Sequence, residues 1–213
     1  MELKFEIKVK GKEKFQNEFP QYYNLINEVY SRFEGKDYNS SSMGTSFDLY
    51  HQLVLDLINK KPKFLLELGS GYTTYLMSKV IQDYNLSTKL LSLENNQYWL
   101  DWLNTEKLNP LNCVVLCELE YWKTNEDEFV RYVYDYDKTK VDYVFLDGPG
   151  HFNVNGTSIK HSINYNYYDI LTTQNKPIDC LIDGRKSTQK FYQKFYKENN
   201  WEDRFLHYGV FQE

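Results

Sequence analysis

The chain has 213 residues, the size of one domain or of one domain with a short extension. Its net charge of −5 gives no overall positive field, so we expect no nucleic-acid partner held by bulk charge. No apolar run is long enough to cross a bilayer, and the N-terminus lacks the apolar core of a signal peptide. We therefore expect a cytoplasmic protein with no membrane partner.

Before residue 62 the sequence predicts a strand and two helices. Apolar and charged residues alternate over 3–9, as in a half-buried strand, and Gly11-Lys12 is a candidate turn. Apolar residues at three- and four-residue spacing predict amphipathic helices over 19–33 and 46–61. A polar loop over 36–45 separates these two helices.

We treat residues 1–45 as an N-terminal extension and residues 46–213 as the main domain, together forming one compact unit. The extension can cover an acceptor pocket or form a homodimer contact, and the sequence leaves both roles open.

From residue 63 onward strands and helices alternate regularly. The predicted strands cover residues 64–67, 89–93, 114–116, 141–146, 177–182 and 204–211. The predicted helices cover residues 72–82, 97–103, 126–134, 163–171 and 188–198, with a polar loop over 150–158. This order predicts the α/β class, with a doubly wound, mostly parallel sheet and helices on both faces, in a Rossmann-like arrangement.

The three cysteines, Cys113, Cys117 and Cys180, lie in or beside apolar segments and match no zinc-site spacing. We expect them to be buried free thiols.

A glycine turn follows the opening strand, in the stretch KFLLELGSGYTT over Lys63–Thr74. Gly69 and Gly71 let the backbone take positive φ and let a ligand approach where no Cβ stands. The helix that follows offers unpaired N–H groups beside the turn. The stretch therefore predicts a nucleotide-type binding site.

Acids occupy the ends of successive predicted strands. In parallel sheets, ligands bind beyond the carboxyl ends of the strands, at the point where the strand order reverses. The residues at these ends are Glu67, Glu94, Glu118, Asp147 and Asp183.

Two residues of the turn argue against a dinucleotide. The dinucleotide fingerprint needs a third glycine three residues after Gly71, where this chain has Thr74. Glu67 lies just before the turn and would repel a pyrophosphate, so the turn suits a ligand with a cationic group.

The acid, the alternate glycines and Glu94 resemble the class I methyltransferases that use S-adenosyl-L-methionine, over about residues 64–186. The resemblance implies a Rossmann-like methyltransferase fold. It also implies that the turn Gly69, Ser70 and Gly71 passes close to the methionine part, and that Glu67 lies near its ammonium group. Glu94 would accept hydrogen bonds from both ribose hydroxyls, and Glu118 would lie in the adenine region.

The stretch DGPGH, over residues 147–151, with Asp183 at the next strand end, resembles a subgroup that methylates hydroxyls of sugars and other small molecules. The resemblance implies O-methylation, with Asp147 close to the cofactor's reactive methyl. Methyl transfer needs positioning and, for an alcohol, a base. Asp147 is the first candidate base and His151 the second, with Asp183 as the neighbouring acid.

Some relatives hold a divalent metal with acids at the positions of Asp147 and Asp183. Gly184 replaces the usual second acid here, so we commit to no metal ligands. Arg185 can bind an anionic acceptor group or pair with Asp183, and both roles stay open.

The expected function is thus a methyltransferase of a small-molecule or saccharide hydroxyl. Two alternatives remain: a non-catalytic interaction module with the same fold, and a nicotinamide-dependent oxidoreductase, which Thr74 disfavours.

Overall fold

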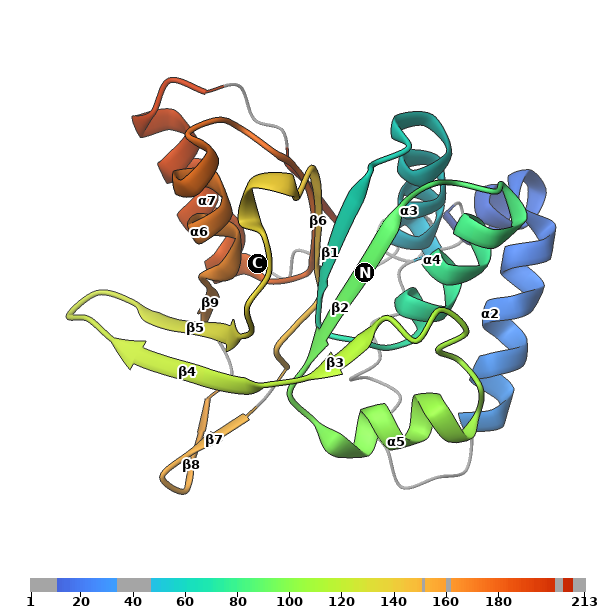
Figure 1. The fold of residues 1–213 in the computed structure, drawn as a ribbon, viewed down its shortest axis with the longest axis horizontal. Coiled ribbons are helices and arrows are strands. Elements are labelled where there is room, and N and C mark those ends of the chain that lie inside the picture. The colour runs from blue at the N-terminus through green and yellow to red at the C-terminus, as the bar shows by residue number, and fades with distance from the viewer. Residues whose placement is uncertain (1–10, 34–46, 151, 160–161, 202–204, 209–213) are drawn as a thin grey trace, which may run out of the picture.

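Six parallel strands form the central sheet (Figure 1). In spatial order they are β11 (Phe205–Tyr208), β10 (Asp179–Asp183), β6 (Tyr143–Leu146), β1 (Phe64–Leu68), β2 (Lys89–Glu94) and β3 (Val114–Leu116). The structure, a computed structural model, describes residues 11–33, 47–150, 152–159, 162–201 and 205–208. Every strand predicted for this sheet is present, and the prediction of a doubly wound α/β fold is confirmed.

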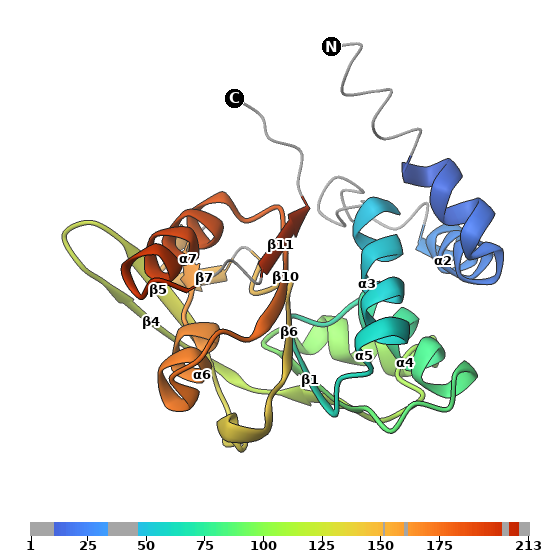
Figure 2. The ribbon, with the colours of Figure 1, turned by 90° about the horizontal axis from the view of Figure 1, so that it is seen from above.

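Helices cover both faces of the sheet (Figure 2). One face carries α2 (Pro20–Phe33), α3 (Phe47–Lys60), α4 (Tyr72–Asp83) and α5 (Gln97–Thr105). The other carries α6 (Asn166–Gln174) and α7 (Lys186–Glu198). The chain runs outward from β1 to β3 and then crosses back to β6, so the strand order reverses between β1 and β6.

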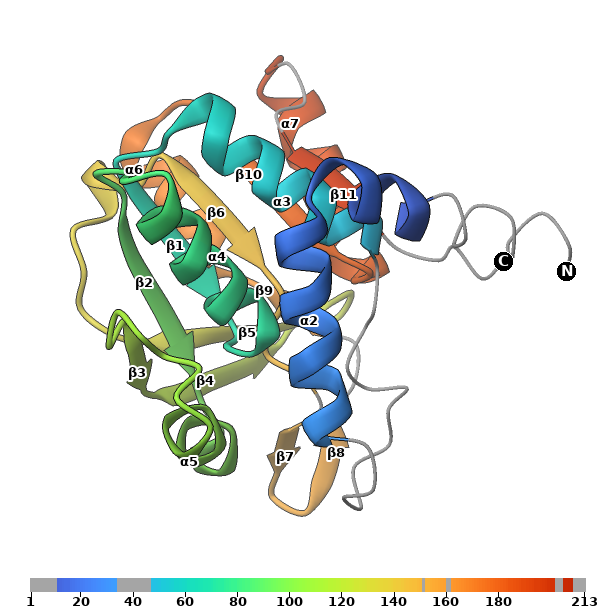
Figure 3. The ribbon, with the colours of Figure 1, turned by 90° about the vertical axis from the view of Figure 1, so that its right-hand side faces the viewer.

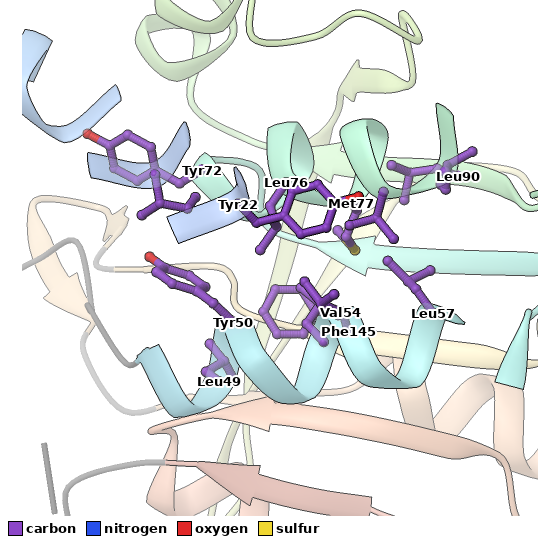
Figure 4. Close-up of a cluster of buried hydrophobic side chains, with 14 of the residues drawn as sticks. Tyr22, Leu49, Tyr50, Val54, Leu57, Tyr72, Leu76, Met77, Leu90 and Phe145 are labelled. Carbon is purple, nitrogen blue, oxygen red and sulfur yellow. The ribbon is translucent and has the colours of Figure 1, made fainter. Parts of the chain in front are cut away.

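Alternate strand residues enter two separate cores. Leu65 and Phe145 face the core under α3 and α4, whereas Leu66 and Val144 face the core under α6 and α7. Figure 4 shows the first of these cores, in which Phe145 lies among side chains of α3 and α4, such as Val54 and Met77. β1 and β6 are buried along their whole length, so the middle of the sheet is buried on both faces.

The N-terminal region differs from the prediction. Residues 11–18 are helical, so the turn predicted at Gly11-Lys12 is wrong. Phe15 and Phe19 are buried one helical turn apart against His51 of α3, and this packing favours a helix. The strand predicted over 3–9 lies outside the described residues, as does the predicted loop over 36–45.

The helix predicted over 126–134 is wrong, because this segment is β5 (Glu128–Val133). It pairs antiparallel with β4 (Glu118–Lys123), and β9 (Ile163–Asn164) lies parallel on its other side. Cross-strand contacts explain the difference: Trp122 stacks on Phe129 at 5.5 Å between ring centroids, and Arg131 pairs with Glu120. A helix would break these contacts.

The predicted polar loop over 150–158 contains a hairpin of β7 (Phe152–Val154) and β8 (Thr157–Ile159). Its two turn residues, Asn155 and Gly156, both have positive φ, as short hairpin turns require. The helix predicted over 163–171 begins later, at Asn166, because Ile163 and Asn164 pair with β5.

Cys113 and Cys180 are buried free thiols, as expected, and Cys117 is a half-buried one. No helix in the described ranges is long and apolar enough to cross a membrane.

Candidate functional site

The predicted site residues gather beyond the carboxyl ends of the strands. In Figure 3 the arrowheads of β2 and β6 point toward the side where α5 and the β7–β8 hairpin lie. The glycine turn joins β1 to α4 at this edge, beside the point where the strand order reverses. The edge is therefore where a ligand of a doubly wound sheet binds.

The two glycines of the turn have different surroundings. Gly69 has φ +96°, and a Cβ there would lie 2.7 Å from the backbone of Gly148. Gly71 has an extended backbone, and a Cβ there would meet no atom within 4 Å. Glycine is thus required at position 69 because the turn after β1 contacts the bend at Gly148. The open space that a ligand could fill lies at Gly71.

Glu67 lies beneath the turn and is fully buried. Its two carboxyl oxygens accept hydrogen bonds from the hydroxyls of Thr73 and Thr74, each at 2.6 Å. The Thr74 hydroxyl in turn accepts from the N–H of Gly71 at 3.0 Å. Burial raises the pKa of Glu67 to about 8. Through these bonds Glu67 holds the turn and the start of α4 together.

Glu94, at the end of β2, is 4% exposed and bonded at both oxygens. Oε2 accepts from the N–H and the hydroxyl of Ser70, at 2.8 and 2.7 Å. Oε1 accepts from the N–H groups of Asn95 and Asn96, at 2.9 and 2.8 Å. Burial raises the pKa of Glu94, and these hydrogen bonds oppose that rise. The four donors fill the lone-pair sites of the carboxylate.

A cavity of about 670 Å³ lies next to Glu94. Asn95 and Asn96 line it, together with Glu118 and residues from the ends of β3 and β4 and from β7. Tyr121 and Phe152 meet edge to face in its wall, with ring centroids 5.9 Å apart. Glu118 thus lies on the same cavity as the residues that hold Glu94. A volume of this size is ordinary for a small-molecule site.

Asp147 directly follows β6 and Asp183 ends the neighbouring strand β10, and their carboxyl groups share a hydrogen bond. Burial and then the Asp147 charge raise the pKa of Asp183 to about 8. With its pKa raised to about 8, Asp183 keeps its proton near neutral pH.

Arg185 makes two contacts that were not considered from the sequence. Its charge opposes the rise in the pKa of Asp183, and its binding of an anionic acceptor group stays a prediction. Its guanidinium donates to the main-chain carbonyls of Asp147 and Pro149. On the other side of the bend, the side-chain amide of Asn164 donates to the carbonyl of Gly148 at 2.9 Å. Arg185 and Asn164 therefore hold the Asp-Gly-Pro bend in place.

Tyr132 is a site residue that the sequence did not indicate. It lies on β5 and is 2% exposed, and its hydroxyl has no hydrogen-bond partner among the described residues. A Cβ on Gly148 would lie 2.2 Å from this hydroxyl, which places Tyr132 against the bend. No sequence signal could reveal the contact, since it depends on how β5 packs. The alternating glycines and Thr73-Thr74, by contrast, could have indicated the bonds to Glu67 and Glu94.

His151 lies outside the described residues. No group of three or more His, Cys, Asp or Glu side chains in the described ranges is arranged to hold a metal ion. Asp147 and Asp183 alone are a sparse ligand set for a divalent cation, which takes six or more oxygens.

No family model matches this sequence, and no curated protein matches it.

Proposed function

We propose that this protein binds S-adenosyl-L-methionine and transfers its methyl group to a hydroxyl of a small molecule or a saccharide. The observation that carries the proposal is the pair of acids around one glycine turn, Glu67 beneath it and Glu94 beside it. A cavity large enough for a nucleoside adjoins Glu94, and the space above Gly71 is open. Cofactor chemistry would then occur at the point where the strand order reverses.

The carboxyl pair supports transfer to a hydroxyl. When bound, the sulfonium supplies an electrophilic methyl; the carbon–sulfur bond breaks as the carbon–oxygen bond forms, leaving a neutral thioether. The acceptor hydroxyl must lose its proton during this step. Asp147 is the candidate acceptor of this proton, and Asp183, whose pKa is raised to about 8, lies beside it. The order of the strands puts Asp147 one strand and Asp183 two strands from the glycine turn.

The hydrogen bonds around the bend serve positioning. Arg185 and Asn164 fix the carbonyls of the Asp147–Pro149 bend from two sides. A base that is held still loses less entropy when it meets its substrate, and displacement reactions gain greatly from such alignment. Asp147 is thus our candidate base and Asp183 its partner.

A nicotinamide-dependent oxidoreductase is the second candidate, favoured by one observation. The strand order, numbered along the main sheet as 3-2-1-4-5-6, is that of dinucleotide-binding sheets. Against it, Thr74 is fully buried where the third glycine would allow helix and strand to pack closely. Its hydroxyl is also committed to Glu67 and Gly71.

Isothermal titration calorimetry separates the candidates. We expect S-adenosylhomocysteine to bind with a dissociation constant in the micromolar range and NAD⁺ or NADP⁺ to give no heat. Glu94→Ala should abolish the binding, while Glu126→Ala, in the exposed β4–β5 turn, should leave it unchanged. Binding of a dinucleotide alone would favour the oxidoreductase. If neither ligand class binds at millimolar concentration, the proposal is wrong and the non-catalytic interaction module becomes the better hypothesis.

A further inference from the structure

The hydrogen bonds between Glu94 and Ser70 occupy part of the carboxylate that the ligand is expected to bind. Of the four donors on the Glu94 carboxylate, three are main-chain N–H groups, from Ser70, Asn95 and Asn96. These three N–H groups belong to the main chain of the glycine turn and of the end of β2. They cannot move away from Glu94 unless the turn or the strand end unfolds. The fourth donor is the Ser70 hydroxyl, at 2.7 Å from Oε2.

The Ser70 hydroxyl is the donor that can leave. Ser70 is half-buried, and its side chain needs only a rotation about one bond to release Glu94. Released, the hydroxyl can bond water. The place it leaves on Oε2 is on the side of Glu94 that bonds the glycine turn, where Gly71 borders open space. A ligand hydroxyl brings the same O–H donor to that place.

We propose that Ser70 is a specificity-determining residue whose hydroxyl occupies the place of one ligand hydroxyl on Glu94, and that binding exchanges the two. This inference rests on the proposed function, because it takes the ligand to be a nucleoside with a ribose diol. The exchange frees only one acceptor position on Glu94. Glu94 would therefore bind one ribose hydroxyl, whereas the resemblance found in the sequence implied that it binds both.

The exchange predicts that Ser70 competes with the ligand. In Ser70→Ala the ligand hydroxyl no longer displaces a bonded side chain, so S-adenosylhomocysteine should bind three- to tenfold more tightly than to the wild type. Ser70→Thr keeps the hydroxyl and should bind as the wild type does. Ser187→Ala, a matched change in the first turn of α7, should also leave the affinity unchanged.

Calorimetry with S-adenosylhomocysteine on these variants tests the exchange, with thermal unfolding to show that each variant folds. Equal or weaker binding by a folded Ser70→Ala, with binding retained by the wild type, overturns the exchange and leaves the proposed function standing. Absence of binding by both proteins overturns the proposed function and the exchange with it.

A second measurement needs no variant and covers the case in which Ser70→Ala does not fold. Adenosine, 2′-deoxyadenosine and 3′-deoxyadenosine are titrated into the wild-type protein. Loss of one hydroxyl should weaken binding at least tenfold, and loss of the other by less than threefold. Equal losses for the two deoxynucleosides would mean that Glu94 binds the diol symmetrically, against the proposal.

Discussion

Gly69 and Gly148 lie back to back, one in the turn after β1 and the other in the bend after β6. A Cβ added to Gly69 would lie 2.7 Å from the backbone of Gly148, and a Cβ added to Gly148 would lie 2.5 Å from the backbone of Gly69. The contact brings the glycine turn and the Asp-Gly-Pro bend together. The proposed donor and acceptor sites thus share one wall, formed by two residues without side chains.

This contact predicts a difference between the two glycines of the turn. Gly69→Ala combines a positive φ with a clash, so we expect it to lower the free energy of unfolding by about 2–4 kcal/mol. Gly71→Ala puts its methyl group into open space with an extended backbone, and should change the free energy by less than about 0.5 kcal/mol. Urea unfolding measures both.

The variants at Gly69 and Gly71 also separate an effect on folding from an effect on ligand binding. Gly71→Ala should weaken S-adenosylhomocysteine binding by about tenfold, since its methyl group takes up ligand space. If Gly71→Ala instead folds and binds as the wild type does, the ligand does not approach the turn at Gly71.

The buried carboxyl of Glu67 should make stability depend on pH. Its pKa is about 8 in the folded protein and is set by burial, against an ordinary value of 4.5. The folded state therefore keeps a proton that the unfolded state loses. This contribution to stability is complete below about pH 4.5 and is lost as the pH rises through about 8.

Glu67→Gln cannot ionise, so its free energy of unfolding should fall less between pH 5 and pH 9 than that of the wild type. Some decrease remains because Asp183, with its pKa also raised to about 8, acts in the same direction. Urea unfolding at the two pH values gives the comparison, with Glu118→Gln, at an exposed position of β4, as the control. Equal decreases in wild type and Glu67→Gln would show that Glu67 is ionised inside the fold.

The shared hydrogen bond of Asp147 and Asp183 predicts a change in titration. Asp147→Asn removes a negative charge next to Asp183 and replaces an acceptor by an amide, so the pKa of Asp183 should fall below about 8. Burial remains and keeps it above its ordinary range. Carbon-13 NMR of the Asp183 carboxyl across pH 4–10 measures the shift, and an unchanged midpoint would mean that the two carboxyls do not interact.

Two buried tyrosines provide a matched pair for hydroxyl removal. The Tyr143 hydroxyl donates to Asp56 at 2.6 Å, so Tyr143→Phe should lower the free energy of unfolding by about 1.5–3 kcal/mol. The Tyr132 hydroxyl has no partner in the described part of the chain, so Tyr132→Phe should be neutral or stabilise by up to about 1 kcal/mol. Thermal and urea unfolding test both, and a loss in Tyr132→Phe as large as in Tyr143→Phe would indicate a bound water at Tyr132.

The sequence by itself determined the strands of the main sheet, the glycine turn and the acids at the strand ends. These features are local: an apolar run, alternate glycines and a following helix start identify themselves within about a dozen residues. The doubly wound class followed, because strands that alternate with helices have few other ways to bury both faces.

Only the tertiary structure decided which of these residues meet. Asp147 reaches Asp183 because β6 pairs with β10, and Gly69 reaches Gly148 because β1 pairs with β6. The same holds for β5, which was predicted as a helix and which pairs as a strand with β4. Pairing between distant segments depends on packing free energy summed over the whole sheet, and short-range patterns do not contain it.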